Sequence, residues 1–88
     1  MAAVIAVFSG VVQGVNFRRN FSSTAQRMGL KGWVRNLPDG TVESYITGDD
    51  ESIRTLLDES RKLPNVFVSK IELRDAAEAE VEGFEIRR

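Results

Sequence analysis

The spacing of apolar residues changes several times along this chain, and the order of these changes limits the folds it can adopt. Residues 4 to 8 are continuously apolar and rich in β-branched side chains, which is typical of a strand buried on both faces or centrally placed. The next apolar residues recur at intervals of four, four and three, which indicates an amphipathic helix: Phe17, Phe21, Ala25 and Met28. We expect Gly29 to end this helix in the left-handed conformation.

Two strand-like runs, residues 32 to 37 and 41 to 47, flank the tripeptide Pro-Asp-Gly. Proline presets φ, aspartate hydrogen-bonds nearby backbone and glycine adopts positive φ, so this break predicts a hairpin turn. In the second run apolar and polar side chains alternate, which predicts one buried face and one partly solvated face, with Tyr45 pointing outward. The pattern suits an antiparallel sheet that is covered on one side.

A second helix is predicted between Asp49, as its N-cap, and Pro64. Acidic residues are concentrated in its first turn, while Arg61 and Lys62 lie near its end, as the helix dipole favours. Its inward-facing residues are expected to be Ile53, Leu56, Leu57 and Leu63.

The last quarter of the chain predicts two more strands. Residues 66 to 74 form the first, with these side chains on one face: Phe67, Ile71 and Leu73. The acidic, alanine-rich residues 75 to 82 are compatible with a loop or a helical turn, and we interpret them as a solvated surface segment. Residues 84 to 87 resemble a short closing strand.

This order predicts an α+β, ferredoxin-like βαββαβ sandwich. Two helices cover one face of a four-stranded antiparallel sheet, and a short extra strand lies at the C-terminus. With 88 residues the chain is expected to form one domain, residues 1–88.

The composition excludes several kinds of chemistry. The chain has neither cysteine nor histidine, so it has no thiolate nucleophile, disulfide, imidazole base or common zinc ligand. Twelve basic and 13 acidic residues give a net charge of −1, which does not favour a protein that coats nucleic acid or an anionic membrane. The apolar run near the start is too short to span a bilayer, and we expect a cytoplasmic protein with no membrane partner.

Arg18 and Arg19 stand at the start of the first predicted helix, where the helix dipole disfavours cations. A loop with Gly10 and Gly14 precedes them, and such a loop can turn successive backbone N–H groups into one concavity that binds an anion. A bound phosphate or carboxylate would explain why two arginines stand at this helix start. The spacing is explained equally well without a ligand: the glycines would only shape a turn, and Arg18 would pair with a nearby carboxylate.

Three other residues have simple structural interpretations. Arg19 is assigned to solvent, and Asn36, just before the turn, is by default a turn-favouring residue. Trp33 is by default a core or half-buried sheet residue.

Three stretches carry a resemblance to a known family: "GVVQGVNFR", "AQRMGLKGWVRNLPDGTVE" and the terminal "GFEIRR". They resemble the acylphosphatase family, with its G-x-V-Q-G-V-x-F-R and G-W-V-x-N motifs, over nearly the whole chain. The resemblance implies a ferredoxin-like hydrolase that splits a carboxyl-phosphate mixed anhydride into a carboxylate and inorganic phosphate. It implies neither metal nor cofactor, with a small-molecule acyl phosphate as substrate.

The resemblance also implies roles for individual residues. Arg18 binds the phosphoryl group, and Asn36 orients the attacking water as the second catalytic residue. The loop backbone that cradles the phosphoryl oxygens corresponds to residues 13 to 17: Gln13, Gly14, Val15, Asn16 and Phe17.

The chain departs from the family pattern at two places. Val11 stands where lysine or arginine is common, and "LPNVFV" stands where a Gly-Pro step is common. Neither departure replaces a residue with an implied catalytic role. The loss of a cation at position 11 puts substrate affinity in doubt rather than turnover.

Two other functions compete with this hypothesis. A noncatalytic acylphosphatase-like module would bind a phosphorylated ligand without turnover. An RNA-binding domain with the same element order would need paired aromatic residues on its central strands, which "GWVRN" lacks. We expect a monomer with no nucleic-acid partner.

Overall fold

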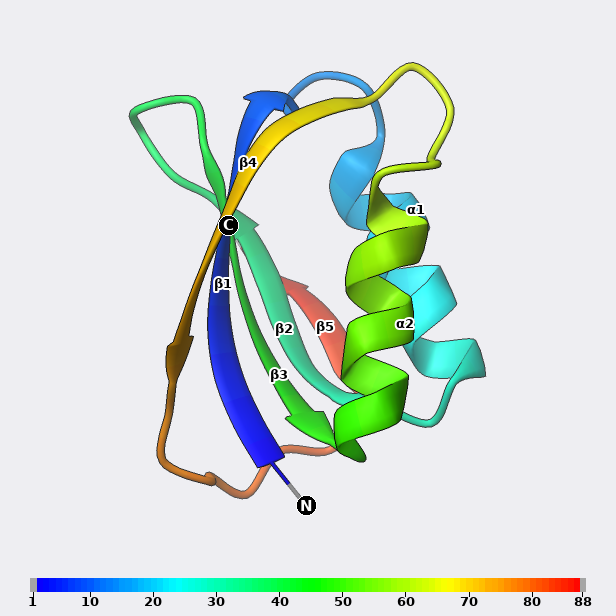
Figure 1. Ribbon diagram of the computed structural model, residues 1–88, viewed down its shortest axis with the longest axis vertical. Helices are drawn as coiled ribbons and strands as arrows, with labels where there is room; N and C mark the ends of the chain where they lie inside the picture. The colour runs from blue at the N-terminus through cyan, green and yellow to red at the C-terminus, as the bar shows by residue number, and fades with distance from the viewer. Residues whose placement is uncertain (1, 88) are drawn as a thin grey trace.

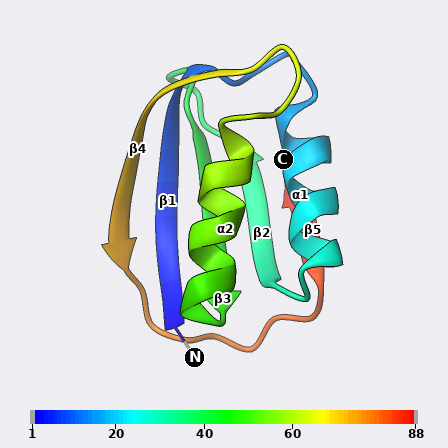
Figure 2. The same ribbon diagram turned by 45° about the vertical axis from the view of Figure 1, so that its right-hand side comes forward.

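A five-stranded sheet with both helices packed on one of its faces makes up the structure, a computed structural model that describes residues 2 to 87 (Figures 1 and 2). The elements along the chain are β1 (Ala2–Val11), α1 (Phe17–Arg27), β2 (Lys31–Asn36), β3 (Val42–Gly48), α2 (Asp50–Ser60), β4 (Phe67–Asp75) and β5 (Phe84–Arg87). The ferredoxin-like α+β architecture predicted from the sequence is confirmed. The segment left open between loop and helical turn, residues 75 to 82, contains no helix: Asp75 ends β4, and residues 76 to 82 are irregular.

The strands lie in the order β4-β1-β3-β2-β5. The first four are antiparallel to their neighbours, as predicted, whereas β5 extends the same sheet by pairing parallel to β2, from Gly32↔Phe84 to Arg35↔Arg87. Because β1, β2 and β5 all run in one direction, their C-terminal ends meet at the same edge of the sheet, where α1 also begins (Figure 1).

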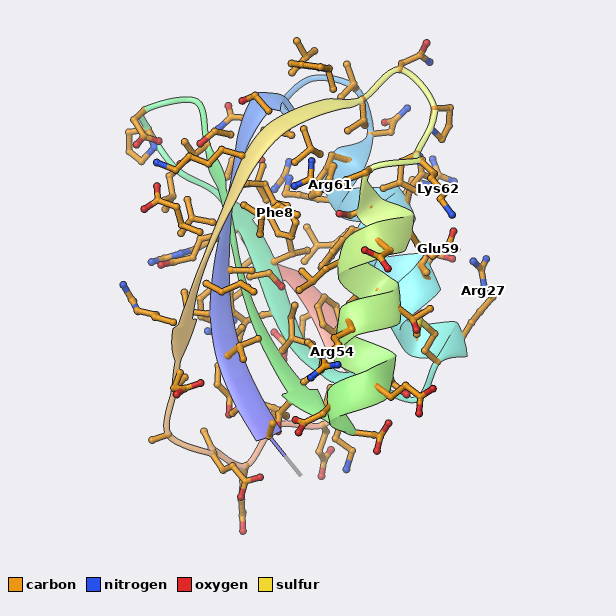
Figure 3. All side chains as sticks on the ribbon, in the orientation of Figure 1. Phe8, Arg27, Arg54, Glu59, Arg61 and Lys62 are labelled. Atoms are coloured by element: carbon orange, nitrogen blue, oxygen red, sulfur yellow. The ribbon has the colours of Figure 1, made fainter. Side chains whose placement is uncertain are left out.

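The larger core lies between the sheet and the helices. The helical spacing seen in the sequence places Phe17, Phe21 and Ala25 in this core, where all three are buried. Phe8 of β1, labelled in Figure 3, contacts both phenylalanines, and its ring centroid lies 5.1 Å from that of Phe17 and 5.2 Å from that of Phe21. Each such side chain contributes about 1.5–3 kcal/mol through burial. This packing fixes α1 against the end of β1.

A second, smaller core lies on the opposite face of the sheet. Ala3, Ile5 and Tyr45 are buried there, and Ala76 and Val81 pack against them. The expectations that Tyr45 points into solvent and that the acidic segment is merely solvated are therefore wrong. β1 has apolar side chains on both faces, so both faces must be shielded from water. The helices shield one face, and residues 76 to 83 shield part of the other.

A bulge in the pairing of β1 with β4 changes which side chains of β4 are buried. The register shifts between Ser9 and Gly10, so the alternation along β4 reverses and Val68, rather than Phe67, faces the core. The predicted common face of Phe67, Ile71 and Leu73 is wrong for this reason; Phe67 is 63% exposed. Gly10 lies in the strand, not in the loop, and a Cβ there would clash with the backbone of Phe67.

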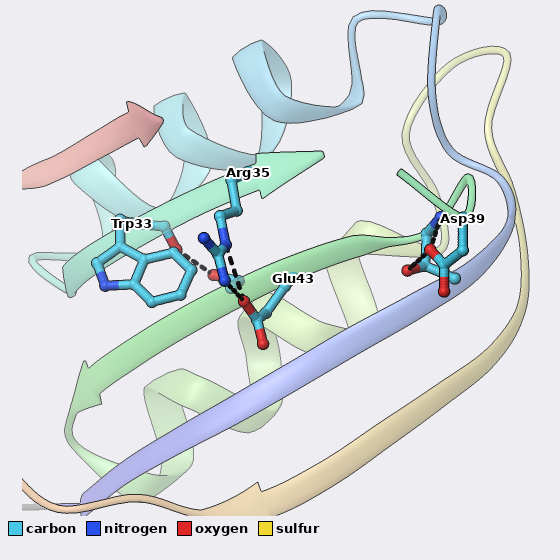
Figure 4. Close-up of polar contacts among 6 residues, drawn as sticks. Trp33, Arg35, Asp39 and Glu43 are labelled. Atoms are coloured by element: carbon cyan, nitrogen blue, oxygen red, sulfur yellow. Dashed lines mark hydrogen bonds and ion pairs between the residues drawn. The ribbon is translucent and has the colours of Figure 1, made fainter. Parts of the chain in front are cut away.

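The hairpin turn and the second helix follow local rules. Asp39 Oδ1 accepts hydrogen bonds from Thr41 Oγ1 (2.6 Å) and Thr41 N (3.0 Å), and both lower the pKa of Asp39 (Figure 4). Arg35 and Glu43 form an ion pair of 2.7 Å across the hairpin strands (Figure 4).

The predicted cap of α2 is confirmed, since Asp49 Oδ2 accepts a hydrogen bond from Ser52 N at 3.1 Å. No helix within residues 2 to 87 is long and apolar enough to cross a membrane.

Candidate active site

The loop between β1 and α1 leaves a row of backbone N–H groups without partners. Gly14 (φ 75°) and Asn16 (φ 62°) are both left-handed, and they turn the chain sharply from the strand into the helix. Within residues 2 to 87, no backbone carbonyl accepts a hydrogen bond from the N–H groups of residues 13 to 18. Free N–H groups in this conformation form a concavity that favours an anion.

The N-terminus of α1 adds to the positive potential of this loop. The N-cap residue, Asn16, makes no side-chain capping bond, and the first turn contains no acidic residue. In α2, by contrast, Asp49 caps the helix, and Asp50 and Glu51 lie in the first turn. Of the two helices in residues 2 to 87, α1 alone thus leaves its helix dipole uncompensated at the N-terminus.

Arg18 is held at the start of α1 by the last strand. Its Nη1 donates a hydrogen bond to the carbonyl oxygen of Arg87 in β5, at 3.1 Å. A guanidinium has five donors, so this contact leaves others for a ligand. The parallel pairing of β5 with β2 thereby restrains a residue that lies 69 positions away in the sequence.

Asn36 contributes a buried oxygen without a partner. It is the last residue of β2, paired with Val42 of β3, and its Oδ1 is buried with no hydrogen bond among the described residues. A buried acceptor without a donor costs about 1–3 kcal/mol. The arrangement is therefore favourable only when a water or a ligand donates to this oxygen.

These groups meet in one pocket of about 250 Å³ at the edge of the sheet where β1, β2 and β5 end. Its lining residues are Val12, Gly14, Asn16, Phe17, Arg18, Arg19, Asn36 and Ile86. The pocket brings together five of the seven residues predicted for the site. Two of its lining residues are arginines, and none of the eight is acidic.

Gln13 and Val15, the other two predicted residues, do not line the pocket. The side chain of Gln13 instead donates from Nε2 to the carbonyl oxygens of Leu37 and Thr41, both at 2.8 Å. Val15 packs against the larger core. Both residues hold the loop in place, and the N–H groups of both remain free.

Sequence reasoning missed three residues of the pocket. Arg19 was assigned to solvent, and its side chain is indeed exposed, yet it also lines the pocket. Its position beside Arg18 was the available signal. Ile86 lines the pocket because β5 pairs with β2, and this long-range pairing cannot be predicted from a local sequence pattern. Val12 also lines the pocket and is buried.

The donor groups around the pocket suit an anion rather than a metal ion. They are N–H groups and guanidinium groups, whereas metal ions prefer imidazole, thiolate and carboxylate ligands. Within residues 2 to 87 no group of three or more acidic side chains lies close enough to hold a metal ion.

A family model, curated relatives and solved structures all include acylphosphatases among the matches to this chain. The family model described as Acylphosphatase matches residues 4–86. The chain is 42% identical over 78 residues to an acylphosphatase of Thermococcus kodakarensis, which covers 88% of this chain and 86% of the relative. It is 42% identical over 84 residues to one of Acaryochloris marina, covering 94% and 90%. The crystal structure of acylphosphatase from Bacillus subtilis superimposes with a TM-score of 0.93 over 100% of both chains, at 28% identity.

Proposed function

This chain belongs to the acylphosphatase family of hydrolases, and we propose that it hydrolyses small acyl phosphates to a carboxylate and inorganic phosphate without metal or cofactor. The observation that carries the proposal is that free loop N–H groups, Arg18 and the unpartnered oxygen of Asn36 share one pocket. We also propose that residues 1–88 form a single domain.

The phosphoryl group binds at the loop. Backbone N–H groups of residues 13 to 18 and the N-terminus of α1 surround its oxygens, and Arg18 donates to two of them. Charge spreads over these oxygens in the loose transition state of phosphoryl transfer. Donors that are already oriented stabilise that charge without reorganising.

Asn36 orients the attacking water. Its buried Oδ1 accepts a hydrogen bond from the water and holds it in line with the leaving group. The leaving carboxylate has a conjugate-acid pKa of roughly 4, so it departs without a general acid. The phosphoryl group itself or bulk water accepts the proton of the attacking water.

The proposal is tested with the purified protein and a simple acyl phosphate in the presence of a chelator. We expect turnover to persist with chelator. Arg18→Ala should lose both the binding of inorganic phosphate and the rate, because its guanidinium contacts the phosphoryl oxygens. Asn36→Ala should bind phosphate nearly as tightly as the wild type while kcat falls about 10²-fold or more.

Arg27→Ala is the matched control for Arg18→Ala, because Arg27 is an exposed arginine at the other end of the same helix (Figure 3). Equal phosphate affinity in the wild type and Arg18→Ala would refute the cradle. Loss of turnover on adding chelator would refute the metal-free mechanism. Phosphate binding without turnover would favour a noncatalytic module.

We further propose a cytoplasmic monomer without a nucleic-acid partner. An RNA-binding domain of this fold stacks bases on the sheet face opposite the helices. Here residues 76 to 83 cover part of that face, and Tyr45 is buried beneath them. This arrangement supports a small-molecule substrate rather than a single-stranded nucleic acid.

A further inference from the structure

Arg19 is the second arginine of the pocket, and no group in the described chain holds its guanidinium. Within residues 2 to 87 it takes part in no ion pair, and its guanidinium makes no hydrogen bond. Arg18, by contrast, is restrained by the carbonyl oxygen of Arg87. Two neighbouring positive charges thus stand at the N-terminus of α1 with no acidic residue in the first turn.

The pocket is larger than a phosphoryl group requires. One water occupies about 30 Å³ in the liquid, so a cavity of about 250 Å³ has room for a phosphoryl group and for part of the group attached to it. With the phosphoryl group at the loop and Arg18, and the attacking water at Asn36, the lining side chains left for the rest of the substrate are Val12, Arg19 and Ile86, of which Val12 is buried. The guanidinium of Arg19 favours an anionic group on the substrate, whereas the side chain of Ile86 favours an apolar one.

We propose that Arg19 selects substrates by binding an anionic group on the acyl part, so that the enzyme prefers acyl phosphates carrying a second negative charge. This inference rests on the proposed function. In the proposed function the free loop N–H groups and Arg18 bind the phosphoryl oxygens, which leaves the charge of Arg19 for the other end of the substrate. A substrate with only an apolar acyl group leaves Arg19 unpaired and contacts Ile86 alone.

The test compares benzoyl phosphate with 4-carboxybenzoyl phosphate, which differ by one carboxylate on a rigid ring that cannot cyclise. The readout is the ratio of kcat/KM for the carboxylated substrate to that for benzoyl phosphate. We expect Arg19→Met to lower this ratio about two- to fivefold, within the range of an exposed ion pair. Arg19→Lys, which keeps the charge, should retain most of the ratio, and added salt should lower the wild-type ratio.

Arg54→Met is the matched control. It removes the same charge from an exposed arginine near the start of α2, at the opposite end of the helix layer from the pocket (Figures 1 and 3). The ratio of the two kcat/KM values in Arg54→Met should equal that in the wild type. Removing Arg19 does not weaken the helix, because a cation at an N-terminus is unfavourable there, and thermal unfolding of both variants checks this.

Three outcomes would overturn the inference. An equal loss of kcat/KM on both substrates in Arg19→Met, which leaves the ratio unchanged, would assign Arg19 to the phosphoryl group. No change in kcat/KM on either substrate would leave Arg19 in solvent, and an equal drop of the ratio in Arg54→Met would reduce the effect to net charge. A wild type that hydrolyses neither substrate would instead refute the proposed function itself.

Discussion

Single side chains hold the loop of the pocket in position, and their partners lie far away in the sequence. Gln13 bonds to the hairpin at Leu37 and Thr41, 24 and 28 positions along the chain. Arg18 bonds to Arg87. The loop carries left-handed residues and free N–H groups that do not stabilise it by themselves, so these long-range contacts supply the restraint that an anion-binding conformation requires.

Gln13→Ala is expected to lower the free energy of unfolding by about 1–3 kcal/mol, because two partly buried hydrogen bonds of about 0.5–1.5 kcal/mol each are lost, while Leu37 O and Thr41 O keep their backbone donors. Urea unfolding measures this loss. The matched control is Gln26→Ala, which removes a single hydrogen bond to Phe84 O from an exposed residue and should cost less. A smaller loss for Gln13→Ala than for Gln26→Ala would contradict the role of Gln13 as the link between loop and hairpin.

The two helices are equally long, yet they begin in opposite ways. The N-terminus of α2 has a capping aspartate and further acidic residues, as helix stability favours. The N-terminus of α1 has an uncapped left-handed Asn16 and two arginines. Because α1 is fixed by its buried phenylalanines instead of by its end, this terminus is available for ligand binding. The start of α2 therefore stabilises the fold, whereas the start of α1 is part of the candidate active site.

Asp49→Ala is expected to destabilise the protein by about 0.5–2 kcal/mol, because Ser52 N loses its capping acceptor. Asp50→Ala is the control, since it removes an equal charge from the same turn but no capping bond. Chemical denaturation should show the larger loss for Asp49→Ala. Equal losses would mean that charge alone, and not the hydrogen bond, stabilises this end.

At the scale of the whole molecule, the sheet is covered on both faces by different means. The helices cover one face, and the irregular residues 76 to 83 cover part of the other. Tyr45 fastens this segment, since its hydroxyl donates to Ala77 O (3.1 Å) and accepts from Ala79 N (2.8 Å). The segment leads directly into β5, whose last carbonyl holds Arg18, so the cover and the site are parts of one continuous stretch of chain.

Tyr45→Phe is expected to release this segment. The Ala79 amide loses its acceptor and should exchange its hydrogen faster, and the free energy of unfolding should fall by about 1–2 kcal/mol. Hydrogen exchange followed residue by residue measures the effect. Ser44→Ala removes a hydrogen bond to Trp33 O on the helix-facing side and should leave Ala79 exchange slow. Unchanged exchange at Ala79 in Tyr45→Phe would show that the apolar contacts alone hold the segment.

Local patterns in the sequence determined the order of the elements, the hairpin turn, the cap of α2 and the buried stripe of α1. These features depend on residues close together in the chain, such as Asp49 with Ser52 or Asp39 with Thr41. The motif around Arg18 and Asn36 indicated the family, and the family model matches residues 4–86. The roles of those two residues stay predictions until the variants are measured.

Only the tertiary structure decided the parallel pairing of β5, the bulge at Gly10 and the cover over Tyr45. The spacing of apolar residues reports which side chains are buried, but not which distant segment buries them. Ile86 and the carbonyl of Arg87 reach the pocket only because β5 lies beside β2, across more than 50 residues of chain. Contacts between segments so far apart are set by how the whole sheet assembles, and no short stretch of sequence encodes them.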